Sequence, residues 1–127
     1  MEGTILKASM VISGSEATDR GNVQDVAEAT VQCLLNAAPA ALAGVVFLSG
    51  GQSDEEATAH LDAMNRLGTF SWPLSFSYGR ALQAAALSVW GENINANAAA
   101  AQKRLAHRAR MNGLAAMGQY EASMEPV

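Results

Sequence analysis

The sequence has little cysteine, little charge and no long apolar run, and each shortage argues against a class of protein. Cys33 is the only cysteine among 127 residues, so no disulfide can form within the chain. Only 16% of the residues are charged and the net charge is −4, which disfavours nucleic acid or an anionic membrane as a partner, because both require a basic surface. The longest nearly unbroken apolar run, residues 37–48, is too short to span a bilayer.

The first residues also lack the basic and apolar segments of a secretory signal peptide, so we expect a cytoplasmic protein. Cys33 lies in an apolar, helix-like stretch, where a small core residue is expected rather than a reactive thiol. His60 and His107 are far apart and have no partners at ligand spacing, so no metal site is predicted.

Half of the residues are hydrophobic, which is enough to bury the core of one domain over residues 1–127. Three short apolar segments, residues 4–7, 45–48 and 74–77, predict strands, and a helical pattern follows each. The helices are expected at residues 23–38, at residues 53–67 with Ser53 and Glu56 as a capping box and Gly68 as the stop, at residues 80–90 closing at Gly91, and at residues 95–112 capped by Gly113.

Alternating strands and helices predict an α/β fold with a parallel sheet and right-handed crossovers. Open doubly wound sheets and barrels both fit this order. Three strands are too few for either, since a (β/α)₈ barrel has eight strands and about 250 residues. Trp72, Tyr78 and Trp90 are too scattered to form a stacking platform and are expected in the core, and the basic residues 103–110 are expected on a solvated face.

Ligands of α/β folds bind at the carboxyl ends of the strands, and three features of the sequence lie there. The first is Lys7, at the predicted end of the first strand, where apolar neighbours would favour the neutral, nucleophilic amine. An ordinary surface lysine explains the same residue, and on sequence alone that reading is the stronger one.

The other two features are loops that suit a phosphate group. Ser49, Gly50 and Gly51 follow the second strand, and paired glycines let backbone N–H groups approach an anion. Ser77, Gly79 and Arg80 lead from the third strand into a helix N-terminus, where amides and a guanidinium favour an anion. An ordinary turn and an exposed arginine are the alternatives. The two loops together indicate a phosphate site more specifically than either loop alone.

Three blocks of the sequence resemble class I (Schiff-base) fructose-bisphosphate aldolases. They are residues 2–7 (EGTILK), 47–53 (FLSGGQS) and 75–83 (SFSYGRALQ), and residues 112–116 (NGLAA) resemble the same family. The blocks have the order and spacing of the family, so the resemblance covers essentially the whole chain.

The resemblance implies that the chain is the C-terminal three βα units, strands six to eight, of a (β/α)₈ TIM barrel and is incomplete as an isolated chain. It implies a glycolytic lyase that reversibly cleaves fructose 1,6-bisphosphate to dihydroxyacetone phosphate and glyceraldehyde 3-phosphate, with no metal or other cofactor. Lys7 matches the Schiff-base lysine. Ser49 and Gly50, and Ser77, Gly79 and Arg80, match the residues that hold substrate phosphate.

The departures from the family bear on activity. Ala8 stands where the family usually has proline, and the acidic residues and second lysine of the earlier strands have no counterpart here. Tyr120 is a poor match for the tyrosine at the end of the family's tail. We therefore expect an inactive or partner-dependent aldolase segment, as a homo-oligomer or complemented by the N-terminal part of a barrel. The alternatives are a non-catalytic half-barrel that binds sugar phosphate or self-associates, and a Schiff-base lyase for another sugar phosphate.

Overall fold

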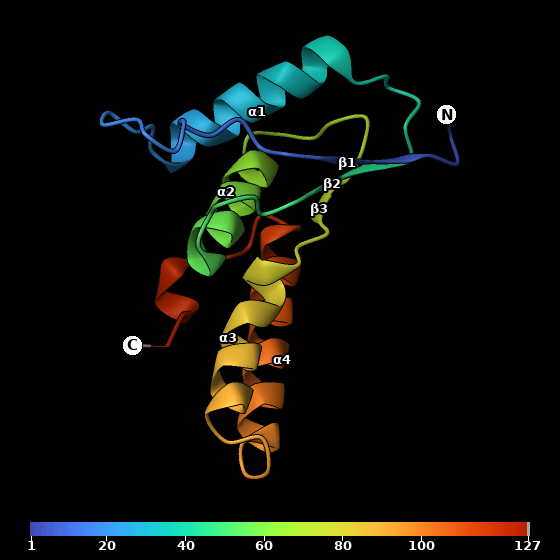
Figure 1. The fold of residues 1–127 in the computed structure, drawn as a ribbon. Coiled ribbons are helices and arrows are strands. Elements are labelled where there is room, and N and C mark those ends of the chain that lie inside the picture. Colours follow the sequence, from blue (N-terminus) through green and yellow to red (C-terminus); the bar gives the residue numbers. More distant parts are fainter. Residues whose placement is uncertain (127) are drawn as a thin grey trace.

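The structure, a computed structural model, describes residues 1–126 and is built on one parallel sheet. Strands β1 (Ile5–Ala8), β2 (Gly44–Phe47) and β3 (Leu74–Phe76) lie in sequence order, and each is followed by a helix (Figure 1). The helices are α1 (Val23–Ala37), α2 (Asp54–Arg66), α3 (Arg80–Glu92), α4 (Ala98–Ala115) and a short 3₁₀ turn, η1 (Ala122–Met124). The predicted α/β class with a parallel sheet is confirmed.

The strands are shifted by one residue at some ends relative to the prediction. β1 continues to Ala8, so Lys7 is the last but one residue of the strand and not its end. In register, Lys7 pairs with Val46 and Val46 pairs with Ser75. Because partners in a parallel ladder point to the same side, these three side chains form one row on one face of the sheet.

The two faces of the sheet have different surroundings. Val45, Phe47 and Leu74 are almost fully buried on the face against which the helices pack. On the other face Ile5 and Lys7 are exposed, and Val46 and Ser75 are half-buried. A parallel sheet is normally covered on both faces, and inside a complete barrel its inner face is filled by side chains. Residues 1–126 pack helices against one face only.

The helices that follow β1 and β2 begin at capping boxes. The predicted pair of Ser53 and Glu56 is confirmed: the Glu56 amide donates to Ser53 Oγ at 3.2 Å, and the Ser53 amide donates to Glu56 Oε2 at 3.0 Å. Asn22 and Asp25 form a second box at the start of α1, which the apolar pattern alone did not reveal. Each box satisfies amides that the first helical turn leaves without partners.

The helix ends are less well predicted. Gly68, with a φ of 155°, follows α2 as expected, but Gly91 and Gly113 lie inside α3 and α4. α4 continues to Ala115, which is fully buried, because packing of its last turn outweighs the roughly 1 kcal/mol cost of one glycine. The chain turns instead at Gly118, whose φ is 68°.

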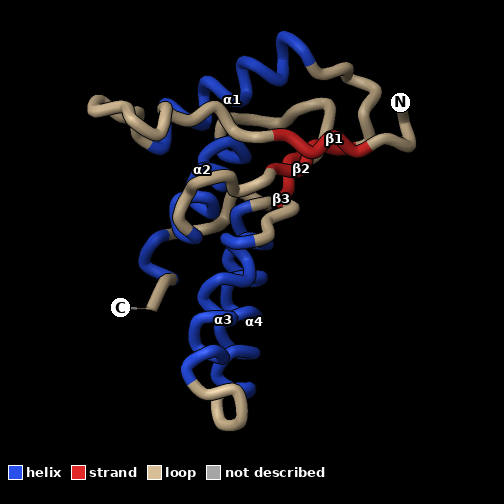
Figure 2. Tube along the Cα trace, in the orientation of Figure 1, coloured by secondary structure: helices blue, strands red, loops and turns tan. Residues whose placement is uncertain are grey.

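α3 and α4 form an antiparallel hairpin that extends away from the sheet (Figure 2). Trp72 and Tyr78 are buried as predicted, but Trp90 lies on this hairpin and is 44% exposed, so the expectation of a core position was wrong. Its indole N–H donates to the carbonyl of Ile94 at 3.1 Å, which satisfies the polar end of the ring locally. The hairpin contains too few layers to bury it.

Two leucines on neighbouring helices provide a matched test of where the core lies. Leu61 of α2 is fully buried, whereas Leu87 of α3 is 56% exposed. We expect Leu61→Ala to lower the free energy of unfolding by about 3 kcal/mol, because it leaves a cavity. Leu87→Ala should change it by less than about 0.5 kcal/mol. Urea unfolding followed by circular dichroism measures both, and equal effects of the two substitutions would contradict this placement of the core.

Candidate functional site

The carboxyl ends of the three strands meet at one edge of the sheet. Beyond the last strand pairs, the Leu48 amide donates to the Ala8 carbonyl at 2.9 Å, and the Ser77 amide donates to the Phe47 carbonyl at 2.8 Å. Neighbouring strands of a sheet are about 4.8 Å apart, so the three loops that leave this edge lie within about 10 Å of one another. The edge therefore brings together the three segments that the sequence singled out.

Lys7 reaches this edge from β1 and lies on the open face of the sheet. Its side chain is exposed, so the apolar walls expected around it are not supplied by residues 1–126. The residues beside it in the row are Val46, which is apolar, and Ser75, which offers a hydroxyl. A nucleophilic amine at this position would need further cover from elsewhere.

Residues 49–52 form a tight turn after β2. The Gln52 amide donates to the Ser49 carbonyl at 2.9 Å, and Gly51 has a φ of 80°, a conformation that favours glycine. Ser49 is buried, and a Cβ on Gly50 would lie 2.7 Å from Leu48 Cδ1. Gly51 is thus the residue that the backbone conformation of the turn favours, and a side chain at Gly50 would require the end of the Leu48 side chain to move.

Residues 77–80 connect β3 to α3 and are held in place by Tyr78. The Tyr78 hydroxyl donates to the Ala57 carbonyl of α2 at 2.7 Å, and burial raises the pKa of this phenol well above its usual value. Gly79 caps α3 without any side-chain hydrogen bond, unlike the caps of α1 and α2. The first amides of α3, with the exposed Arg80 beside them, are therefore left for a ligand or water.

His60 of α2 is a residue near this edge that the sequence analysis did not assign to the site. It is 7% exposed, and its Nδ1 lies 2.6 Å from Gln52 Oε1, directly after the glycine turn. Burial lowers the pKa of the imidazole, and the negative charge of Glu56 opposes that shift. A signal was present in the sequence, because His60 lies three residues after Ala57 and four before Met64, which is the spacing of one helical face.

A buried ionic cluster joins the end of the chain to α4 and α2. Glu125 accepts hydrogen bonds from Arg108 at 2.6 Å and from Tyr120 at 3.1 Å, and its other oxygen lies 2.8 Å from His107 Nε2. Arg108 also donates to Thr58 Oγ1 and to the carbonyl of Asp54 at the start of α2. Arg108 is almost fully buried, so the prediction that the basic residues of α4 form a solvated face was wrong for this residue.

The electrostatics of the cluster favour a negative charge on Glu125. Burial acts to raise the pKa of its carboxyl, but the hydrogen bonds from His107, Arg108 and Tyr120 outweigh burial, so the pKa lies below the usual value. Burial and the nearby Glu125 raise the pKa of Tyr120 to about 12. Among residues 1–126 the buried side-chain donors Arg108 Nε and Asn112 Nδ2 have no partner, so this region is short of acceptors.

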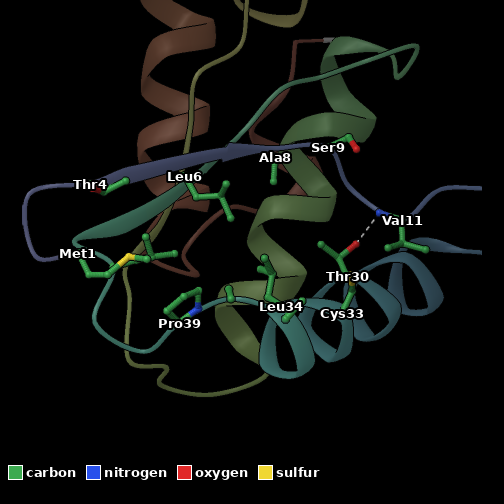
Figure 3. A pocket seen from close by; sticks show the side chains of 13 residues that line it. Met1, Thr4, Leu6, Ala8, Ser9, Val11, Thr30, Cys33, Leu34 and Pro39 are labelled. Carbon is green, nitrogen blue, oxygen red and sulfur yellow. Dashed lines mark hydrogen bonds between the residues drawn. The ribbon is translucent and has the colours of Figure 1, made fainter.

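An apolar groove runs between β1 and α1 on the covered side of the sheet (Figure 3). Its volume is about 470 Å³, and Leu6, Ala8 and Leu34 contribute to its walls. The Val11 amide donates to Thr30 Oγ1 at 2.9 Å at one end, as the dashed line in Figure 3 shows. Cys33 lines the groove and is exposed, so the expectation of a core cysteine was wrong. The groove has no convergent polar groups suited to catalysis.

Within residues 1–126, no three His, Cys, Asp or Glu side chains are gathered in a way that could hold a metal ion. None of the helices in that part of the chain has the length and apolar character needed to cross a membrane.

Comparison with known proteins gives one consistent family. The model of the family "Fructose-bisphosphate aldolase class-I" matches residues 1–126. A protein of Xanthomonas axonopodis pv. citri, named "Probable fructose-bisphosphate aldolase class 1", is 55% identical over 121 residues, which are 95% of this chain and 36% of that protein. The fructose-bisphosphate aldolase of Dictyostelium discoideum is 50% identical over 121 residues, which are 94% of this chain and 33% of the relative.

A solved structure agrees with these sequence relatives. The fructose-bisphosphate aldolase of Plasmodium falciparum, crystallised with TRAP and a small-molecule inhibitor, superposes with a TM-score of 0.90 at 48% identity. The match covers 94% of this chain and 34% of the other. The chain thus spans about a third of the length of the relatives it matches.

The ionic cluster leads to a prediction about stability and pH. We expect Glu125→Gln to lower the free energy of unfolding by about 3 kcal/mol at pH 7, because Arg108 would stay buried without its carboxylate. Since folding lowers the pKa of Glu125, its contribution is complete above the usual value of 4.5 and is lost as the pH falls through the folded-state value. The difference between wild type and variant should therefore shrink below pH 4.5.

Urea unfolding at several pH values measures this difference. Glu121→Gln, at an exposed carboxylate of the same segment, is the control and should change stability by less than about 0.5 kcal/mol. Equal stabilities of wild type and Glu125→Gln at pH 7 would show that the cluster does not hold the end of the chain.

Proposed function

Because this chain belongs to the class I fructose-bisphosphate aldolase family, we propose that it is the C-terminal part of such an aldolase and carries its Schiff-base lysine. In this proposal β1, β2 and β3 are the sixth, seventh and eighth strands of a (β/α)₈ barrel. Residues 1–127 are then the C-terminal part of a single barrel domain. The proposed reaction is the reversible cleavage of fructose 1,6-bisphosphate to dihydroxyacetone phosphate and glyceraldehyde 3-phosphate.

The observation that carries the proposal is the common edge of the sheet. Lys7, the 49–52 turn and residues 77–80 leave three adjacent parallel strands at their carboxyl ends. In barrels this is the edge at which catalysis takes place, and phosphate is often held by the loops after the last two strands with a nearby helix N-terminus. A nucleophile beside two anion-binding loops suits a ketose phosphate.

Lys7 provides the covalent chemistry in this proposal. Its neutral amine attacks the C2 carbonyl of the substrate, and loss of water gives a protonated imine. When the C3–C4 bond breaks, its electron pair moves toward the imine carbon and nitrogen, and the C4 hydroxyl loses its proton as the aldehyde forms. Protonation of the resulting enamine at C3 and hydrolysis of the imine release dihydroxyacetone phosphate and restore Lys7. The imine is the electron sink, so no metal or cofactor is invoked.

The two loops provide the binding energy and the orientation. Ser49, Gly50 and Gly51 offer a hydroxyl and backbone amides, and the uncapped start of α3 offers more amides with the helix dipole. Ser77 and Gly79 line this second loop, and Arg80 offers a guanidinium that can bind two phosphate oxygens at once. A phosphate held between the loops would fix the C2 carbonyl relative to β1.

The isolated chain is expected to turn over slowly. The proton at the C4 hydroxyl needs a base, and among residues 1–126 the open face around Lys7 offers Ser75 and Val46 but no carboxylate from the sheet. Each missing acid or base typically costs a factor of about 10² to 10⁴. A barrel completed by an N-terminal segment, in the same protein or in another chain, would supply these groups.

A second proposal is a non-catalytic half-barrel that binds sugar phosphate or associates with itself, and the open surfaces of the sheet favour it. In the described part of the chain, one face of the sheet has no helix packed on it, β1 and β3 each have an unpaired edge, and the groove beside β1 is apolar. Unpaired strand edges and exposed apolar surface promote association.

Borohydride trapping tests the role of Lys7, and the sequence makes the test sharp because Lys7 and Lys103 are its only lysines. We expect dihydroxyacetone phosphate and borohydride to add one adduct to the chain, which peptide mapping places on Lys7. Excess inorganic phosphate should suppress the adduct, because it competes for the loops. Lys7→Met should abolish the adduct, and Lys103→Met on the exposed surface of α4 should retain it. An adduct shared equally by the two lysines would argue for nonspecific amine chemistry.

Sedimentation velocity tests the open edge. We expect the weight-average sedimentation coefficient to rise with concentration, because the free edge of β1 and its groove offer an association surface. Leu6→Lys, which places a charge in the groove, should weaken this association, whereas Leu87→Lys on the α3–α4 hairpin should leave it unchanged. A strictly monomeric chain would count against the second proposal, and a reversed order of the two variants would move the interface to the hairpin.

A further inference from the structure

His60 is a buried polar side chain that the proposed chemistry does not use. It extends from the middle of α2 and is 7% exposed. Polar groups at such depth are costly unless they are hydrogen-bonded. The partner of His60 is not on its own helix but in the turn that precedes it.

The hydrogen bond has a defined direction. Nδ1 of His60 lies 2.6 Å from Gln52 Oε1, and an amide oxygen can only accept, so Nδ1 carries the proton and donates. Because burial lowers the pKa of the imidazole, the ring stays neutral at pH 7 with this tautomer. The charged groups near the ring are Glu56 on α2 and Arg20 in the loop before α1, which line the same small cavity.

Gln52 occupies the position that controls the glycine turn. Its backbone N–H donates to the Ser49 carbonyl at 2.9 Å and so closes the turn, and the next residue, Ser53, caps α2. Gly50 and Gly51 by themselves allow many backbone conformations, so a turn that contains them is fixed only by what its ends are bonded to. The hydrogen bond between the Gln52 side chain and His60 adds a second bond at the last residue of the turn.

We propose that His60 is a positioning residue that acts through Gln52 to hold residues 49–52 in the conformation that binds phosphate. It does not touch the substrate. The inference rests on the proposed function for the identity of the ligand, but the hold on the turn is a property of the free protein. The inference predicts that loss of the Nδ1 donor of His60 loosens residues 49–52 and weakens the binding of phosphate, without disturbing the sheet.

The test compares two substitutions of His60. His60→Asn places an amide N–H where Nδ1 stood, and His60→Leu removes the donor while it keeps an apolar side chain. Amide hydrogen exchange of the free protein, followed by NMR, should show the Gln52 backbone amide, which donates to the Ser49 carbonyl, exchanging about tenfold faster in His60→Leu and near the wild-type rate in His60→Asn, since one net hydrogen bond corresponds to about that factor. Amides of β2 and of the middle of α2 should keep their protection.

Two further measurements separate the possible outcomes. Gln52→Leu should loosen the turn as much as His60→Leu, and the double variant should add little, because both remove the same bond. In borohydride trapping, the concentration of dihydroxyacetone phosphate that gives half of the maximal adduct on Lys7 should rise about three- to tenfold in His60→Leu and be restored in His60→Asn.

Three results would overturn the inference. They are unchanged exchange of the Gln52 backbone amide in His60→Leu, equally fast exchange of that amide in His60→Asn, and a loss of protection that extends over β2 and α2, which would make His60 an ordinary core residue. If wild type forms no adduct at all, the proposed aldolase chemistry of this chain fails. The exchange measurements would still decide whether His60 holds the turn.

Discussion

Parallel pairing of three short strands is the constraint on which the rest of the molecule depends. β2 bonds to β1 on one side and to β3 on the other, and the ladder continues past the strand ends through Leu48 and Ser77. Because all three strands run the same way, every loop that follows a strand leaves from the same edge. Lys7 and Ser77, which are separated by 70 positions in the sequence, therefore lie at the same edge of the sheet. If one strand ran antiparallel to the others, the loop that follows it would leave from the opposite edge of the sheet.

α2 holds two of the loops at this edge in place, because it bonds to the turn of residues 49–52 and to residues 77–80. Ser53 and Glu56 cap its start directly after the glycine turn, His60 attaches to Gln52, and the carbonyl of Ala57 accepts from Tyr78 of the third loop. Thr58 and the carbonyl of Asp54 accept from the buried Arg108, which also binds Glu125. One helix thus connects the two candidate phosphate loops with the end of the chain. Its buried face, with Leu61 and Met64, gives these polar contacts a rigid support.

The sequence was sufficient for features that depend on local chemistry. Alternation of apolar strands with helical patterns predicted the α/β class, and Ser53 with Glu56 predicted a helix start that the structure confirms. Features that depend on packing were missed. Gly113 is a poor helix residue, yet the burial of Ala115 carries α4 past it. Arg108 was expected in solvent because its neighbours in sequence are basic, whereas its partner Glu125 lies 17 residues away and pairs only through the folded chain. The edge position of the candidate site residues followed from the strand order, but their roles remain a prediction.

The open face of the sheet explains why the candidate nucleophile and its binding loops differ in how completely they are formed. The glycine turn and the start of α3 obtain their shape from α2 and from backbone bonds within residues 1–126, so they are assembled in this chain. Lys7 obtains its position from β1 but little cover, because within that part of the chain Ile5 and Lys7 both stay exposed. An amine becomes a good nucleophile at neutral pH when burial or a nearby cation disfavours its charged form. In the proposed function, phosphate recognition and imine chemistry would therefore be separable: the first would be carried by β2, β3 and α2, and the second would depend on whatever covers the face of β1.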